Sequence, residues 1–263
     1  MRTSSTATRR RNKVLKLLQD HGQVNVNDLS NTFQVSLETV RGDLKRLETD
    51  NHLIRTHGGA IAKPVDSVPY FSRLQDNILA KQTIAKQAAT LVKPHNRLFL
   101  DASSTSFFLA RELASLDNLT IITDAVRVVM ELAANPSLRI ICVGGALRSS
   151  SYSLVGRSAV ESVEKYHADL FFSSCTGLTK NEGATESDEF EIEVKQAMAR
   201  RADRTVLLAD HTKFGKVGLS QFLELKKISL IVTDVVNEDL LNQFPMILNQ
   251  EQLFNQKKLS TVR

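Results

Sequence analysis

Hydrophobic positions in the first fifty residues recur at helical spacing in three short blocks. The first block precedes Gly22, where its helix is expected to end. The second holds Leu29 and Phe33 on one face, and either Asn25 or Asn27 can cap its helix. After a tight turn, the third block has its buried stripe at Val40, Leu44 and Leu47. Two short helices joined by a tight turn predict a helix-turn-helix.

The second helix of this pair has an apolar back and a polar front, the division that a helix in the DNA major groove needs. Ser36 suits its N-cap. Residues 52–57 then predict a short strand, and Gly58-Gly59 predicts the tight turn of a wing, because adjacent glycines permit positive φ and close approach to a phosphate backbone. The residues expected to contact DNA are Ser36, Thr39, Arg41, Lys45, Arg46, Arg55, His57, Gly58 and Gly59.

The charge distribution supports the interpretation of this motif as a DNA-binding segment. Residues 1–63 contain eleven Lys and Arg against six Asp and Glu, and this surplus equals the formal charge of +5 of the whole chain. A run such as Arg9-Arg10-Arg11 can simply be a solvated helix face. Together with the motif that follows it, the basic surplus favours nucleic-acid binding.

From about residue 78 the pattern changes to short apolar runs that alternate with helical periodicity. Strands are expected at 97–101, 120–123, 140–144, 170–174, 205–209 and 230–233. Continuous apolar strands between helices predict a doubly wound, mostly parallel α/β sheet that is covered on both faces. The expected organisation is a disordered tail at 1–8, a winged helix-turn-helix at 9–61, a linker at 62–77 and an effector-binding α/β domain at 78–263.

Ligands of such sheets bind outside the carboxyl ends of the strands. There, a predicted strand ends at Asp101, and Ser103, Ser104 and Thr105 lead into a helix whose N-terminus could hold a phosphate. The same residues could instead only cap the helix. Further expected ligand-binding residues are Thr123, Asp124, Gly144, Gly145, Gly183, Glu191, Lys195, Asp210 and Lys213.

Each of these features has a plainer interpretation by itself. Gly144-Gly145 can be a structural turn, Asp210 and Lys213 a surface ion pair, and Glu191 with Lys195 a helix-stabilising pair four residues apart. Their convergence on one sheet edge favours a polyol-phosphate pocket. No Walker loop, nucleophile elbow or His/Cys metal spacing is present in the sequence, so we expect no catalytic residue, metal or cofactor.

Composition places the chain among cytoplasmic proteins, associated with DNA if the basic segment binds it. Its apolar runs all fall short of the roughly 20 residues that cross a bilayer. The start MRTSSTATRRRNK has no hydrophobic signal segment. Cys142 and Cys175 lie in apolar runs and are expected to pack in the core of a reducing-compartment protein.

The chain resembles the DeoR family of bacterial transcriptional repressors over nearly its whole length. The N-terminal resemblance is carried by Val35-Ser36, Thr39 to Leu44, Leu47-Glu48 and Leu53 to Ala60. The effector-domain resemblance is carried by Asp101 to Thr105, Gly144-Gly145, Gly183 with Glu191, Glu193 and Lys195, and Ala209 to Phe214. The resemblance implies a fold similar to sugar-phosphate isomerases, and a repressor of a carbohydrate operon that a phosphorylated sugar releases.

Three residues depart from the family pattern. Gly42 replaces a second arginine of the recognition helix, Asn51 replaces a glycine before the wing, and Asp124 replaces an asparagine. If Asp124 touches the ligand, a less anionic or amine-bearing effector is favoured.

A homo-oligomer, dimer or tetramer, is expected to place two or more winged helices on operator DNA. The alternatives are a sugar-phosphate isomerase with an attached DNA-binding domain, and an activator instead of a repressor. The sequence leaves the effector, the operator and the oligomeric state open.

Overall fold

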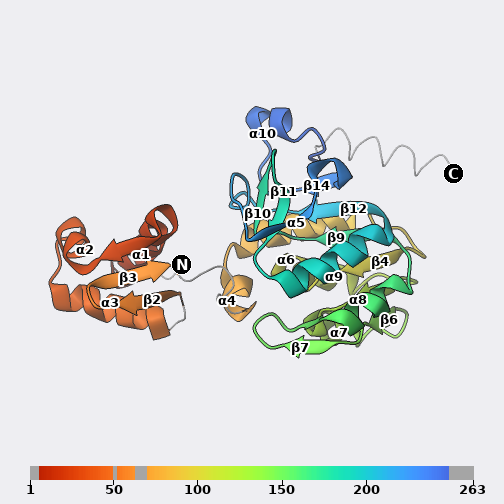
Figure 1. The fold of residues 1–263 in the computed structure, drawn as a ribbon, viewed down its shortest axis with the longest axis horizontal. Helices are drawn as coiled ribbons and strands as arrows, with labels where there is room; N and C mark the ends of the chain where they lie inside the picture. Colours follow the sequence, from red (N-terminus) through yellow and green to blue (C-terminus); the bar gives the residue numbers. More distant parts are fainter. Residues whose placement is uncertain (1–5, 50–51, 63–69, 249–263) are drawn as a thin grey trace. The chain divides into compact units, whose positions relative to one another are not determined.

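The computed structural model of the chain describes residues 6–49, 52–62 and 70–248, with the side chains of residues 19–21 and 62 excepted. It divides into two compact units, residues 1–73 and 74–263 (Figure 1). Helix α4, Tyr70–Gln75, lies across this division and within the expected linker. Residues 63–69 of that linker and residues 1–5 of the expected tail lie outside the described part. Helix α1 already begins at Thr6, inside the segment expected to be a tail.

The N-terminal unit consists of three helices and a small antiparallel sheet. Its elements are α1 (Thr6–His21), β1 (Gln23–Asn25), α2 (Val26–Phe33), α3 (Leu37–Thr49), β2 (Leu53–Thr56) and β3 (Gly59–Ala62). The strand order is β1-β3-β2. This arrangement confirms the predicted winged helix-turn-helix. It also contains β1, which was not predicted because a three-residue strand shows too little alternation of polar and apolar positions.

Local hydrogen bonds explain where these helices begin and end. Gly22 adopts a φ of +73°, and its amide donates to the Leu18 carbonyl, so it ends α1 as predicted. Asn25, and not Asn27, caps α2 by accepting the Asn27 amide at 2.8 Å. The core of the unit is made of apolar side chains from all three helices and the wing, namely Val14, Leu18, Val26, Leu29, Val40, Leu44, Leu47, Leu53 and Ala60.

The wing turn differs from the prediction by one residue. Thr56 pairs with Gly59, so the turn residues are His57 and Gly58, and Gly59 belongs to β3. Neither glycine has a positive φ. Gly59 is required for another reason, because a Cβ there would stand 1.9 Å from the Val24 carbonyl oxygen of β1.

The C-terminal unit is built on a six-stranded sheet with the order β14-β12-β9-β4-β5-β6. All its neighbours pair in parallel, which confirms the predicted sheet. The strands are β4 (Arg97–Leu100), β5 (Thr120–Thr123), β6 (Arg139–Cys142), β9 (Ala168–Ser173), β12 (Ala202–Leu208) and β14 (Leu230–Val232).

Helices cover both faces of this sheet, as continuous apolar strands require. One layer holds α5 (Ile78–Ala89), α6 (Ser104–Leu113) and α7 (Val126–Leu132), which pack on inward residues such as Leu98 and Ile121. The other holds α8 (Arg157–Glu164) and α9 (Glu189–Arg200), which pack on Phe99 and Phe171. Those two rings meet edge to face at 6.4 Å between centroids.

Two small antiparallel elements were not predicted. A hairpin of β7 (Ala146–Arg148) and β8 (Ser153–Val155) follows β6. A sheet of β10 (Gly177–Thr179), β11 (Gly183–Glu186) and β13 (Ser220–Leu223) packs near the end of β12. The chain ends its described part with a short 3-10 turn (Leu225–Lys227) and α10 (Glu238–Gln243). None of the described helices is long and apolar enough to span a membrane.

Candidate functional site

The recognition helix α3 has the two faces that the sequence predicts. Ser36 caps the helix by accepting the Thr39 amide at 3.2 Å, and the Thr39 hydroxyl lies 2.9 Å from the Ser36 hydroxyl. Arg41, Lys45 and Arg46 are exposed. The side chains of Arg41 and Lys45 have no ion-pair partner in the described part of the chain. Both are therefore available to DNA.

Two of the departures from the family pattern fall beside this helix. Gly42 is exposed, and a Cβ at this position would meet nothing within 4 Å. A larger side chain would therefore fit at position 42, and lack of space does not explain the glycine. Asn51 lies outside the described residues.

A buried carboxylate fixes α3 to α1, and sequence reasoning missed it. Asp43 is 6% exposed on the inner face of α3. It accepts from Arg10 Nε at 2.5 Å, and Arg11 approaches its other oxygen at 3.8 Å. Part of the basic run at 9–11 therefore holds the recognition helix in place. An aspartate between Val40 and Leu44 was the available signal, because polar residues are rare on buried helix faces.

The wing is also tied to the recognition helix. Arg55 of β2 lies 3.8 Å from Glu48 of α3, and its amide donates to the same carboxylate at 3.1 Å. Arg55 therefore orients the wing. His57 and Gly58 are exposed at its tip, where the turn residues of a wing can reach DNA, while Gly59 is buried in the sheet.

The strand order of the C-terminal unit reverses between β4 and β9, since the chain proceeds outward from β4 to β5 and β6 and from β9 to β12 and β14. Open α/β sheets bind ligands at such a reversal. Asp101 follows β4 at this point and is fully buried. It accepts from Ser103 and Ser106 of the α6 N-terminus and, at 2.8 and 3.0 Å, from the hydroxyl of Ser173 and the amide of Ser174. Asp101 therefore joins β4, α6 and β9.

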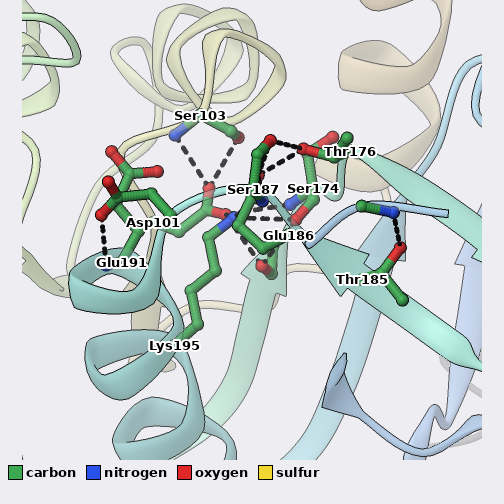
Figure 2. Close-up of polar contacts among 12 residues, drawn as sticks. Asp101, Ser103, Ser174, Thr176, Thr185, Glu186, Ser187, Glu191 and Lys195 are labelled. Atoms are coloured by element: carbon green, nitrogen blue, oxygen red, sulfur yellow. Dashed lines mark hydrogen bonds and ion pairs between the residues drawn. The ribbon is translucent and has the colours of Figure 1, made fainter. Parts of the chain in front are cut away.

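Lys195 of α9 is the buried cation beside Asp101, and Figure 2 shows its side chain rising into the network. Its Nζ lies 3.2 Å from Asp101 Oδ2, bonds Glu186 and donates to the Ser174 carbonyl at 3.1 Å. Burial acts to lower the pKa of Lys195, but the charges of Glu186 and Asp101 overcome it and raise that pKa. Lys195 forms its close ion pairs with Glu186 and Asp101, and Glu191 acts on it only as a more distant charge.

Glu186 ends β11 and is held ionised. Burial alone would raise its pKa, but Lys195, the Thr176 hydroxyl and the Ser187 amide together lower it to about 2. Glu186, Thr176 and Ser187 were not predicted, because they come from the small sheet that the hydrophobic pattern did not reveal.

A second charged group lies at the start of α9. Asp188 caps the helix by accepting the Glu191 amide at 3.1 Å, and Arg148 of β7 bonds Asp188 at 2.6 Å. Glu191 is buried, accepts from Ser153 of β8 at 3.2 Å and lies 3.5 Å from Arg148. The β7-β8 hairpin thus lies against the N-terminal end of α9.

Asp124 is the buried acid without a full set of partners. It follows β5, is 3% exposed, and its Oδ1 has no hydrogen-bond partner among the described residues. Burial, with the nearby charges of Asp101 and Glu191, raises its pKa well above the usual value, while Lys195 acts in the opposite direction.

The α6 N-terminus offers donors next to this acid-rich group. Ser103 caps the helix by accepting the Ser106 amide at 3.1 Å, so its hydroxyl is committed to the fold. The amides and hydroxyls of Ser104 and Thr105 have no hydrogen bond to other described residues. Free N–H groups at the positive end of a ten-residue helix can bind an anion.

Of the remaining predicted residues, some lie at the carboxyl edge of the sheet and others only support the fold. Thr123 donates to the Leu100 carbonyl at 2.7 Å and accepts the Ala125 amide, so it joins β4 to β5. Gly144 and Gly145 follow β6, and Gly145 has a φ of +143°. Gly183 lies at the far end of β11 from Glu186, and a Cβ there would stand 2.4 Å from a backbone oxygen of β13. Its role is close backbone packing.

Asp210 and Lys213 follow β12 but do not form the ion pair that one interpretation predicted. Asp210 accepts the Thr212 amide at 2.9 Å and the Thr212 hydroxyl. Burial acts to raise its pKa, yet the charge of Lys213 and the Thr212 hydrogen bonds lower it. Burial raises the pKa of the nearby Cys175 thiol to about 12, which Lys213 opposes. Lys213 therefore lies within electrostatic reach of the site.

The two cysteines and the acidic residues form no metal centre. Cys175 is buried as predicted, whereas Cys142 is exposed, because β6 is the edge strand of the sheet. Within the described ranges, no group of three or more His, Cys, Asp or Glu side chains could hold a metal ion.

Known proteins match both units. Residues 10–64 match the DeoR-like helix-turn-helix domain, and residues 76–235 match the DeoR C terminal sensor domain. The HTH-type transcriptional regulator GolR of Listeria innocua is 38% identical over 89% of this chain and 94% of its own length. The glycerol-3-phosphate regulon repressor of Escherichia coli is 29% identical over 86% and 90%. These relatives are regulators of transcription and not enzymes.

Among solved structures, ribose 5-phosphate isomerase A from Methanocaldococcus jannaschii is 18% identical, covers 51% of this chain and 53% of its own, and has a TM-score of 0.38. The family assignment rests on the two domain matches, which together extend over most of the chain in the order that the two units show. The chain belongs to the DeoR family of DNA-binding transcriptional regulators.

Proposed function

We propose that the protein represses a carbohydrate-use operon and that a phosphorylated sugar, bound at the carboxyl edge of the six-stranded sheet, releases it from its operator. The observation that carries this proposal is the arrangement at the β4–β9 reversal. There, Asp101 bonds both Lys195 and Ser103 of the α6 N-terminus. The amides and hydroxyls of Ser104 and Thr105 have no hydrogen bond to other described residues.

On the DNA side, the proposal assigns contact to the exposed front of α3 and to the wing tip. Arg41 and Lys45 carry positive charge without a described partner, as phosphate or base contacts need. Ser36 caps this helix through the Thr39 amide, and the N-terminal residues of such a helix read base edges in related folds. The Glu48–Arg55 pair keeps the wing in register with that helix.

On the ligand side, the α6 N-terminus would hold the phosphate, and carboxylates would accept sugar hydroxyls. We assign Asp124 and Glu191 to the sugar hydroxyls, because the oxygens of Asp101 already accept hydrogen bonds from the protein. Lys213 adds a positive charge from the end of β12. Buried hydroxyl and carboxylate groups that converge on a helix N-terminus suit a polyol phosphate.

Release requires that the ligand bind more tightly to a state that does not fit the operator. A tenfold difference in affinity between the two states corresponds to about 1.4 kcal/mol per occupied site. In a dimer or tetramer with several occupied sites, this free energy would suffice to empty an operator.

The test is fluorescence anisotropy of the full chain on DNA from upstream of its own gene, at several salt concentrations, with a panel of sugar phosphates. The proposal expects salt-sensitive binding that one phosphosugar abolishes and its unphosphorylated form does not. Operator binding that no phosphosugar weakens would contradict the ligand assignment and leave the DNA-binding assignment in place.

Lys213→Ala sharpens this test. We expect this variant to bind the operator normally but to need at least tenfold more phosphosugar for release, because a cation within reach of the ligand is lost. Lys216→Ala is the matched control, since it removes an exposed lysine from the same loop. Equal release curves for the two variants would exclude Lys213 from the site.

A further inference from the structure

The acids at the β4–β9 reversal outnumber the bases. Five carboxyl groups, those of Asp101, Asp124, Glu186, Asp188 and Glu191, share two cations, Lys195 and Arg148. Both cations are already engaged, because Lys195 bonds Asp101 and Glu186 while Arg148 bonds Asp188 and Glu191. Asp124 is the one of these five carboxyl groups that forms no ion pair with a described residue.

An unpartnered acid in this position is costly for the free protein. Asp124 is 3% exposed, and its Oδ1 accepts no hydrogen bond from the described residues. Groups buried in this way are normally bonded to protein or ordered water, and each exception calls for an explanation such as a functional role or a bound ion.

Resting on the proposed function, we infer that the effector is a phosphorylated amino sugar whose ammonium group binds Asp124, while its phosphate binds the free amides of the α6 N-terminus. The ligand then supplies the missing cation to the acid-rich side of the pocket and an anion to the helix end. A sugar phosphate that carries a hydroxyl in place of the amine would leave Asp124 without a counter-charge.

This assignment also explains how the empty site tolerates Asp124. The charges that act on it are those of Asp101 from the end of β4 and of Glu191 and Lys195 from α9, while the charge of Asp124 in turn raises the pKa of the Cys142 thiol of β6. Burial and the two acids raise the pKa of Asp124, which favours its neutral form when no ligand is bound. An ammonium group would favour the carboxylate, so binding would release a proton.

The test is calorimetric titration of the full-length protein with matched ligands, glucosamine 6-phosphate against glucose 6-phosphate and galactosamine 6-phosphate against galactose 6-phosphate. In the pair that fits, we expect the amine to bind about tenfold to a hundredfold more tightly, as a charged hydrogen bond would give. Titration in two buffers of different ionisation enthalpy should show proton release with the amine alone.

Asp124→Asn is the decisive variant, because it keeps the shape of the side chain and removes its charge. It should abolish both the preference for the amine and the proton release, while the weaker hydroxyl sugar phosphate binds as before. Glu131→Gln, which removes a charge from the following helix at a surface pair with Arg111, should change neither. Asp124→Ser provides a second variant if the amide perturbs the fold.

The outcomes separate this inference from the proposed function. Equal or tighter binding of the hydroxyl sugars, or an amine preference that survives in Asp124→Asn, would overturn the inference while leaving a sugar-phosphate effector intact. Failure of every phosphosugar, aminated or not, to bind would contradict the proposed function and this inference with it.

Discussion

Replacement of Lys195 by methionine should destabilise the C-terminal unit strongly, and by an amount that depends on pH. Methionine keeps most of the length of the side chain and its apolar packing but leaves Asp101 and Glu186 without their buried cation. Breaking a buried ion pair on one side is more damaging than removing both partners, because an uncompensated charge remains in the interior.

The structure sets the size of the effect. The pKa of Glu186 falls from 4.5 to about 2 on folding. Burial alone would raise this pKa, and the charge and hydrogen bond of Lys195 are the main cause of its fall. A difference of this size corresponds to about 3 kcal/mol of stability at neutral pH. For a unit of this size, 3 kcal/mol lowers the melting temperature by about 6–12 °C.

The pH dependence is the sharper part of this prediction. Because the pKa of Glu186 is depressed in the folded state, its contribution is complete above the unfolded value and is lost as pH falls towards 2. The stability gap between wild type and Lys195→Met should therefore be widest near pH 7 and shrink to less than half by about pH 3.

Calorimetric melting, with far-UV circular dichroism as the second probe, suits a chain that contains no tryptophan. Lys86→Met removes an exposed lysine of α5 and should leave the melting temperature unchanged. Adding Glu186→Gln to Lys195→Met should recover part of the lost stability, because the double variant no longer buries the Glu186 charge without its cation. A loss below about 1 kcal/mol, or a gap that stays constant with pH, would refute the assignment of Lys195 as the centre of the network.

Three further predictions concern the DNA-binding unit. Arg41→Ala should weaken operator binding and reduce its salt dependence by about one phosphate contact without lowering the melting temperature; unchanged anisotropy titrations would remove it from the interface. Arg10→Met should instead cost about 1–3 kcal/mol of stability in that unit and weaken DNA binding through it, because the buried Asp43 loses its hydrogen-bonded partner and keeps only the more distant Arg11; full stability by urea denaturation would contradict this. Gly59→Ala should destabilise the wing by about 2 kcal/mol or more through its clash with β1, whereas Gly42→Ala should stabilise α3 by about 0.5–1 kcal/mol; thermal melts that rank them in the opposite order would disprove the packing argument.

The N-terminal unit was largely predictable because its determinants are local. Helix period, caps such as Ser36 and the turn before α3 depend on residues a few positions apart, and the structure agrees with them. The wing turn was misplaced by one residue because it depends on β1, a partner strand distant in sequence. The Arg10–Asp43 bond escaped prediction for the same reason, since it links residues 33 positions apart.

In the larger unit, the sequence by itself determined the parallel sheet and the strand ends at which polar residues gather. Apolar runs, helices and the rule that strands of a parallel sheet share their carboxyl edge were sufficient for that. They also selected Asp101 and Asp124, which follow strands, whereas Lys195 was noted on a predicted helix as a possible partner of Glu191; how these residues are connected could not be predicted.

Only the tertiary structure decided which of these polar residues hold the site together and which remain available to a ligand. Asp101 and Lys195 proved to be bonded to the protein, with Glu186 and Ser174 as partners that come from other strands. Asp124 was left with one carboxylate oxygen that has no hydrogen-bond partner among the described residues. Hydrogen bonds and charge balance depend on distances of a few ångströms between segments far apart in the chain, and no local pattern encodes those distances.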